Sequence, residues 1–164
     1  MKTLITVIGK VSLIGILIAF GGCSAEENPS GKEEISASVS GIGSFTSSKD
    51  FDTVFGTKIL TGTATTLNIQ GTDNTGKGFL LRISVYSGPG TYELGFNKVD
   101  LASWINGPTA GNQYSTAYQG SSGSIVVSAD LDGHVEGTFE FVGKLSDTSS
   151  TKKVTNGKFK VNLQ

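Results

Sequence analysis

The stretch from Ser124 to Val142 reads S-I-V-V-S-A-D-L-D-G-H-V-E-G-T-F-E-F-V and contains two runs of alternating apolar and polar residues. The dipeptide Asp132-Gly133 separates the runs, and such a dipeptide favours the type I′ turn of a tight hairpin. A period of two is typical of strands that bury one face. We therefore predict a β-hairpin whose inward side chains are Ile125, Val127, Ala129, Leu131, Val135, Phe139 and Phe141.

Similar alternation recurs elsewhere in the chain, where turn clusters such as Asp73 to Gly78 separate the apolar runs. Two segments, 45–58 and 99–118, lack a regular period, so we expect them to be mainly loop, with about one short strand in each. The other predicted strands are 34–39, 65–72, 79–86, 91–94, 124–131, 134–142 and 159–163.

The composition also favours an all-β fold. The 164 residues include 23 glycines, about twice the average usage of roughly 7%. Short strands joined by tight turns need such residues. About eight strands predict an antiparallel β-sandwich or small barrel, two architectures that the sequence does not separate. Phe159, Val161 and Leu163 predict that the last strand lies inside the core.

The first 22 residues differ from the rest of the chain. Met1-Lys2 and Lys10 are basic, Val11 to Phe20 is an apolar run of ten residues, and Gly21-Gly22 follow. This order is typical of a cleaved signal peptide, whose apolar region has 7–15 residues. A transmembrane helix needs about 20 apolar residues, so we predict no mature spanning helix.

Gly21-Gly22-Cys23 resembles the end of a bacterial lipoprotein signal, although Phe20 stands where Leu is usual. In that motif the cysteine becomes the new, lipidated N-terminus. The resemblance implies several acyl chains on Cys23, and two or more chains anchor a protein stably where one does not. Cys23 is the sole cysteine, so it has no internal disulfide partner. The alternative is an ordinary secretory signal followed by an incidental cysteine.

We expect three segments: a lipoprotein signal peptide at 1–22, a lipidated N-terminus and flexible tether at 23–33, and one all-β domain at 34–164. The tether is polar and has no apolar period. Its acidic pair Glu26-Glu27 resembles the export signal of Bacteroidota surface lipoproteins, although a solvated linker explains it equally well. The expected location is the cell envelope, where the lipid anchors the protein to the outer membrane. The sequence does not decide between the periplasmic side and the cell surface.

Four motifs in the domain resemble a Bacteroidota outer-membrane lipoprotein family whose domain has no assigned function. They are P-G-T-Y-E-L-G at 89–95, G-S-S-G-S-I-V-V-S-A at 120–129, V-E-G-T-F-E-F at 135–141 and T-N-G-K-F-K-V at 155–161. The resemblance implies an all-β lipoprotein and supplies no catalytic residue.

Charge and motif content disfavour several classes of function. Residues 23–164 carry a net charge of −3 without a basic block, which disfavours nucleic acid as a partner. The chain has no phosphate-binding G-x-x-x-x-G-K-[ST] and no G-x-S-x-G nucleophile motif. One histidine and one cysteine do not make a usual zinc site. We therefore predict no enzyme activity, no metal and no cofactor.

The charged groups of the hairpin have structural interpretations. His134 directly follows the turn, so we interpret it as a solvent-facing residue rather than a catalytic base. Asp130 and Asp132 match only a fragment of a calcium loop, and a hairpin turn explains them. Glu136 and Glu140 lie about 13 Å apart along one strand, farther than paired glycosidase carboxylates.

Trp104, Tyr114 and Tyr118 fall in the irregular segment 99–118 and are the candidate ligand-binding residues. Aromatic rings on loops stack on sugars or line a barrel mouth. The alternative is that these rings are buried and cap the core. Separately, Thr53 in Asp52-Thr53-Val54 resembles the O-glycosylation acceptor of exported Bacteroidota proteins.

The leading expectation is a non-enzymatic, lipid-anchored binding or interaction module of unknown ligand, whose candidate partners besides the membrane are a glycan and an envelope protein. One alternative is a carrier that holds a small apolar ligand in a barrel, between the inward faces of 79–85 and 135–141. A second is a surface glycan-binding module built on Trp104 to Tyr118. The sequence names neither the ligand nor the oligomeric state.

Overall fold

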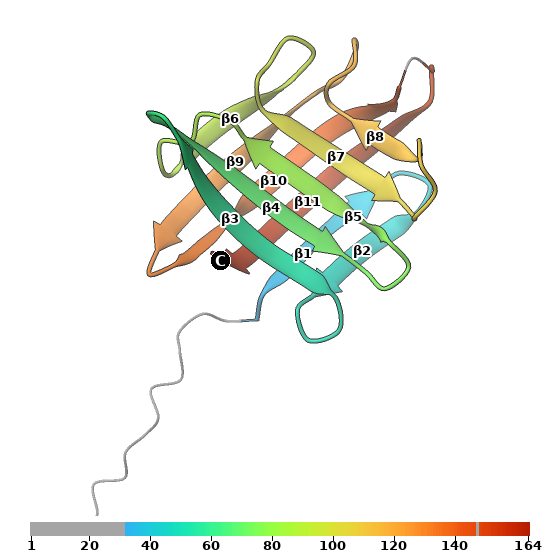
Figure 1. The fold of residues 1–164 in the computed structure, drawn as a ribbon. Coiled ribbons are helices and arrows are strands. Elements are labelled where there is room, and N and C mark those ends of the chain that lie inside the picture. Colours follow the sequence, from blue (N-terminus) through green and yellow to red (C-terminus); the bar gives the residue numbers. More distant parts are fainter. Residues whose placement is uncertain (1–31, 147) are drawn as a thin grey trace, which may run out of the picture.

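The structure is a computed structural model that describes residues 32–146 and 148–164. This part of the chain forms eleven strands and no helix (Figure 1). None of it therefore forms a helix that could cross a membrane. The strands are β1 (Glu34–Val39), β2 (Gly43–Ser48), β3 (Thr53–Thr61), β4 (Ala64–Thr72), β5 (Lys77–Ile83), β6 (Gly90–Gly95), β7 (Leu101–Asn106), β8 (Gln113–Ser115), β9 (Ser122–Leu131), β10 (His134–Leu145) and β11 (Thr151–Asn162).

The strands form two antiparallel layers that face each other. One layer has the order β6-β9-β10-β11-β1-β2, and the other has the order β3-β4-β5-β7-β8. The short strand β8 pairs with the end of β10 at one corner, and a bridge from Gly56 to Leu163 joins β3 to the C-terminus at another. The antiparallel sheet is thus nearly closed into a flattened barrel (Figure 1), which confirms the predicted all-β fold class.

The β9–β10 hairpin confirms the predicted turn. Asp132 and Gly133 have φ values of 51° and 78°, the pair of left-handed residues that a type I′ turn requires. The predicted inward face of β9 is wrong beyond Val127, because Ser128 has no partner across the ladder and forms a β-bulge. The bulge reverses the alternation, so Asp130 turns inward opposite Val135.

The two segments expected to be mainly loop instead supply four strands. Segment 45–58 contributes to β2 and β3, and segment 99–118 contains β7 and β8. On β7, Ala102, Ser103 and Trp104 are all fully buried, so both faces of the strand are covered and the sequence shows no alternation. The strand number is therefore eleven rather than about eight.

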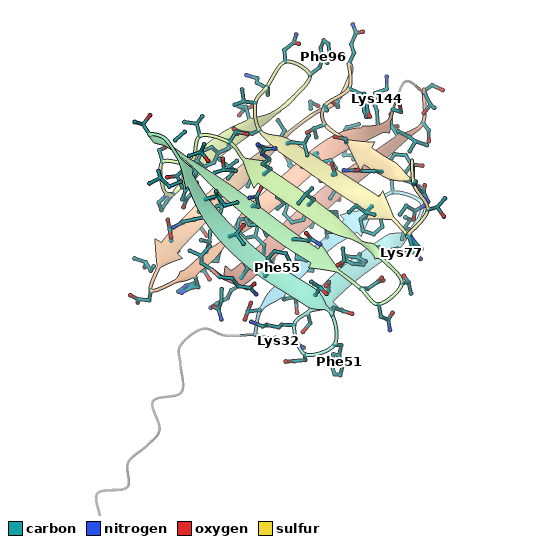
Figure 2. The ribbon with its side chains drawn as sticks, viewed as in Figure 1. Lys32, Phe51, Phe55, Lys77, Phe96 and Lys144 are labelled. Carbon is teal, nitrogen blue, oxygen red and sulfur yellow. The ribbon has the colours of Figure 1, made fainter. Side chains whose placement is uncertain are left out.

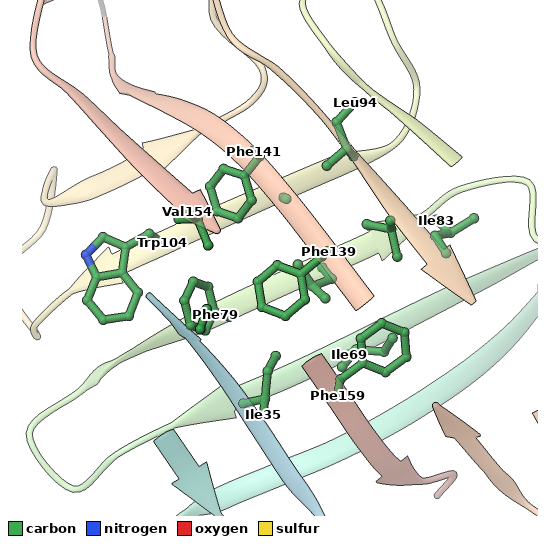
Figure 3. Packing of buried hydrophobic residues seen from close by; sticks show 14 of the residues in the cluster. Ile35, Ile69, Phe79, Ile83, Leu94, Trp104, Phe139, Phe141, Val154 and Phe159 are labelled. Atoms are coloured by element: carbon green, nitrogen blue, oxygen red, sulfur yellow. The ribbon is translucent and has the colours of Figure 1, made fainter. Parts of the chain in front are cut away.

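Aromatic rings meet between the two layers, and Figure 3 shows Phe79, Trp104, Phe139 and Phe141 among them. The Phe79 ring lies 4.9 Å from Trp104, 5.0 Å from Phe139, 5.5 Å from Phe45 and 6.4 Å from Phe141, measured between ring centroids. Most of these pairs are edge-to-face, the arrangement that aromatic quadrupoles favour. The rings come from both layers, so their contacts pack one layer against the other.

Two glycines lie opposite two phenylalanines on β10 and β11. Gly137 pairs with Phe159, and Phe139 pairs with Gly157. A Cβ atom on Gly157 would lie 2.3 Å from the Phe139 carbonyl oxygen and 2.7 Å from its ring, and one on Gly137 would lie 2.6 Å from Phe159 Cζ. Each ring thus occupies the space beside its partner glycine. The motifs V-E-G-T-F-E-F and T-N-G-K-F-K-V are two halves of one packing unit.

The last strand is internal to its layer, as predicted. β11 pairs with β10 on one side and with β1 on the other. Its side chains Val154, Phe159 and Val161 are buried in the core. The C-terminal segment is therefore required to fill the middle of the six-stranded layer.

Candidate functional site

The three candidate aromatic residues do not form an exposed platform. Trp104 is fully buried and packs on Phe45 and Phe79, so it cannot stack on a sugar outside the domain. Tyr114 is only 7% exposed. Tyr118 alone is half-buried, and it lines a surface hollow of about 380 Å³ with Gln113 and Ser115 among others. The interpretation that the rings bury and cap the core fits Trp104 and Tyr114.

The space expected to hold a carried ligand is filled by side chains. The inward faces of 79–85 and 135–141 meet directly, with Phe79 and Phe139 in contact and Phe141 beside both. Phe79 and Val135 have no exposed surface. A small apolar molecule would have to displace these rings, so the geometry does not favour the carrier alternative.

The remaining sequence candidates lie on the surface or outside the described residues. His134 is the half-buried first residue of β10, opposite Leu131 and Asn162. Glu136 pairs with Lys160 at 3.6 Å. Thr53 is exposed at the start of β3, and its O-glycosylation stays a prediction. Cys23 lies outside the residues that the structure describes.

The end of the expected tether is part of the packed domain. Glu33 is buried, and its carboxylate accepts hydrogen bonds from Lys49 Nζ and from the Asn162 side chain and backbone. These contacts tie the start of β1 to the end of β11. Glu33 thus stabilises this end of the sheet, although it lies just before the first strand.

The β-bulge creates a polar cluster that the sequence did not predict. Both Asp130 carboxylate oxygens accept hydrogen bonds from Lys58 Nζ, at 2.5 and 2.6 Å, and Tyr86 Oη donates to Oδ2 at 2.8 Å. Lys58 Nζ also lies 5.2 Å from the Tyr86 ring centroid, within cation–π range. We call Lys58, Tyr86 and Asp130 the Asp130 cluster. It joins β3 and β9 to the segment that follows β5.

Opposing influences act on the pKa values in this cluster. Burial raises the pKa of Asp130, but the hydrogen bonds and charge of Lys58 and the hydroxyl of Tyr86 outweigh it and hold that pKa below its usual value. Burial and the bond to Asp130 raise the pKa of Tyr86 well above its usual range. Asp130 is therefore ionised and Tyr86 protonated at neutral pH, which suits a structural clamp.

We expect Asp130→Asn to lower the free energy of unfolding at pH 7 by about 1–3 kcal/mol, because the amide has no negative charge to pair with Lys58 and only one accepting oxygen for the Lys58 and Tyr86 donors. Because the pKa of Asp130 is lower in the folded protein than its unfolded value of 3.8, ionised Asp130 stabilises the fold above pH 3.8. This stabilisation is lost as the pH falls from 3.8 through the folded-state pKa. The difference in the free energy of unfolding between the wild type and Asp130→Asn, measured by urea denaturation, is therefore expected to be smaller at pH 3 than at pH 7.

The matched control for this prediction is Glu136→Gln, which removes a more exposed ion pair with Lys160. Its cost is expected to stay below about 0.5 kcal/mol. If Asp130→Asn lowers the free energy of unfolding as little as the control does, or by the same amount at both pH values, the Asp130 cluster does not stabilise the fold.

Around the Asp130 cluster, apolar side chains point into solvent. Leu60 follows Lys58 by two residues, Val85 precedes Tyr86, and Leu131 follows Asp130; their exposed fractions are 71%, 62% and 63%. The backbone of Tyr86 also bonds to Thr65, the cross-strand partner of Leu60. We define the apolar rim as Leu60, Val85, Leu131 and the neighbouring Ile59, which is 52% exposed.

The outer face of the six-stranded layer is polar and shallowly hollowed. Two hollows of about 350 and 360 Å³ lie over β9, β10 and β11, lined by Ser and Thr hydroxyls and by Lys158 and Glu136 or Glu140. In residues 32–146 and 148–164, no three His, Cys, Asp or Glu side chains gather as a metal site would require. Exposed apolar side chains also occur elsewhere in the described residues, at Ile42 and Phe96 for example, whereas the apolar rim gathers four of them around the Asp130 cluster.

Comparison with known proteins assigns a family without an activity. A family model described as a domain of unknown function, DUF6252, matches residues 34–161. No curated protein matches the chain. No solved structure matches it either.

Proposed function

The chain belongs to the DUF6252 family, and we propose that it is a lipid-anchored lipoprotein of the bacterial cell envelope that acts as a non-enzymatic binding module. The observation that carries this proposal is Gly21-Gly22-Cys23 directly after the apolar run Val11 to Phe20. The same order of segments is found in bacterial lipoprotein precursors. The four domain motifs and Glu26-Glu27 further support an outer-membrane lipoprotein of the Bacteroidota.

The extent of the folded domain supports an anchor upstream of it. The family match begins at residue 34, and Glu33 just before it is buried in the domain. Cys23 therefore precedes the domain by ten residues, and a chain of that length separates a domain from lipid headgroups by roughly 17–19 Å as a random coil. The domain would then be held close to the bilayer without being embedded in it.

The charged groups of the domain support a non-enzymatic role. Asp130, Glu33 and Glu136 each lie against a lysine, and the first two also accept hydrogen bonds from Tyr86 or Asn162. A catalytic acid or base needs a pKa near the working pH, whereas the pKa values of Asp130 and Tyr86 lie farther from neutrality than usual. These contacts stabilise the fold.

We expect Cys23→Ala to move the protein from the membrane fraction to the soluble fraction, because the thiol is the attachment site of the acyl chains. Membrane fractionation of cells that express the wild type or the variant would measure this. The matched control is Ser24→Ala, which leaves the thiol in place and is expected to stay with the membrane. If Cys23→Ala also stays with the membrane, the lipid anchor is contradicted.

A further inference from the structure

The first residues that the structure describes lie at one end of the domain. Glu33 bonds to Asn162, which is paired with His134, and Leu163 donates to the Gly133 carbonyl oxygen at 2.7 Å. The chain thus enters the domain beside the β9–β10 turn. Leu131 of the apolar rim lies directly across that turn from His134.

A second exposed apolar residue lies beside the same point. Phe51, in the loop between β2 and β3, is 83% exposed. Lys32 forms an ion pair with Asp50 at 3.5 Å, and Lys49 donates its backbone N–H to Glu33, so this loop is held against the start of the domain. Figure 2 shows Phe51 close to Lys32 and pointing away from the sheets. The point of entry therefore lies between Phe51 and the apolar rim.

From this placement we propose that the apolar rim and Phe51 rest on the surface of the lipid bilayer to which the chain is anchored. This inference rests on the proposed lipidation of Cys23. Nine residues lead from Cys23 to Lys32, and at 3.3–3.6 Å per residue they span at most about 32 Å. Strand β10, with 12 residues, is about 40 Å long. The anchor is thus too short to bring the opposite end of the domain against the bilayer.

The charges at this end are compatible with a lipid surface. Lys58 and Asp130, beside the rim, neutralise each other within the Asp130 cluster. Asp132 lies in the turn next to Leu131 and is exposed, so its carboxylate can stay in the aqueous headgroup region. Lys32 and Lys49 are likewise paired with Asp50 and Glu33. Four of the charged groups at this end are therefore paired with each other, which lowers the charge that must be desolvated when the rim approaches acyl chains.

The test places an environment-sensitive probe on the rim of the full-length, lipidated protein. In Leu131→Cys the new thiol is free, while that of Cys23 is in a thioether, so a nitrobenzoxadiazole label attaches at one site. The matched control is Thr109→Cys, an exposed position in the loop between β7 and β8 at the opposite end. Both proteins are reconstituted into vesicles of phosphatidylethanolamine and phosphatidylglycerol that contain a nitroxide-labelled lipid.

We expect both proteins to float with the vesicles, and the label at position 131 to be quenched about twofold or more strongly than the label at position 109. Equal, weak quenching in floating protein would overturn the bilayer contact while leaving the anchor intact, and is the result expected of a rim that binds a protein partner. Failure of both proteins to float would contradict the lipid anchor and the contact that depends on it.

Discussion

A chain that ends at Asn156 is expected to have no cooperative folding transition. The deletion removes the second half of β11, which pairs with β1 and β10 in the middle of the six-stranded layer. It also removes the buried side chains of Phe159 and Val161, each of which contributes about 1.5–3 kcal/mol through burial. With the ladder hydrogen bonds on both sides, the loss approaches the whole stability of a small domain, about 5–15 kcal/mol.

Thermal denaturation followed by circular dichroism would measure this effect. The matched control removes only Gln164, which is exposed and contributes one backbone hydrogen bond to Gly56. That chain is expected to melt within a few degrees of the wild type. A sharp melting transition in the chain that ends at Asn156 would contradict the central position of β11.

Gly157→Ala is expected to destabilise the domain by about 3 kcal/mol, near the upper end for overpacking a core. The new Cβ would lie 2.3 Å from the Phe139 carbonyl oxygen and 2.7 Å from the Phe139 ring. The oxygen belongs to a central strand and the ring packs against Phe79 and Phe159, so neither can move freely. The midpoint of urea denaturation is the measurement.

Gly90→Ala is the control for this substitution. Gly90 also lies in a strand, yet a Cβ there meets no atom within 4 Å, so its effect is expected to stay within about 0.5 kcal/mol. Equal midpoints for the two variants would contradict the packing of Phe139 beside Gly157.

The strands and turn of the β9–β10 hairpin were predictable from the sequence, but the bulge in β9 was not. Alternation and the Asp132-Gly133 turn were sufficient to predict the two strands and their connection. The bulge at Ser128 was not predictable, because an unpaired residue is visible only in the register of the partner strand. This one residue turns Asp130 inward and Leu131 outward, so it creates both the Asp130 cluster and part of the apolar rim.

The segments predicted as loop show a different limit. Period-two alternation marks strands with one covered face, but β7 is covered on both, and on the buried face of β2 Phe45 is followed by Ser47, a polar residue that is also buried. Trp104 was assigned to an irregular segment for this reason. The Gly–Phe motifs, in contrast, were visible in the sequence, but the reciprocal pairing of Gly137 with Phe159 needed the structure.

Intact mass spectrometry of the protein extracted from membranes would show whether Cys23 carries the lipid that holds this domain at a membrane. We expect a chain that begins at Cys23 and is heavier than residues 23–164 by a glyceryl group and its acyl chains. A membrane-extracted chain that begins elsewhere, or that has the unmodified mass, would contradict it.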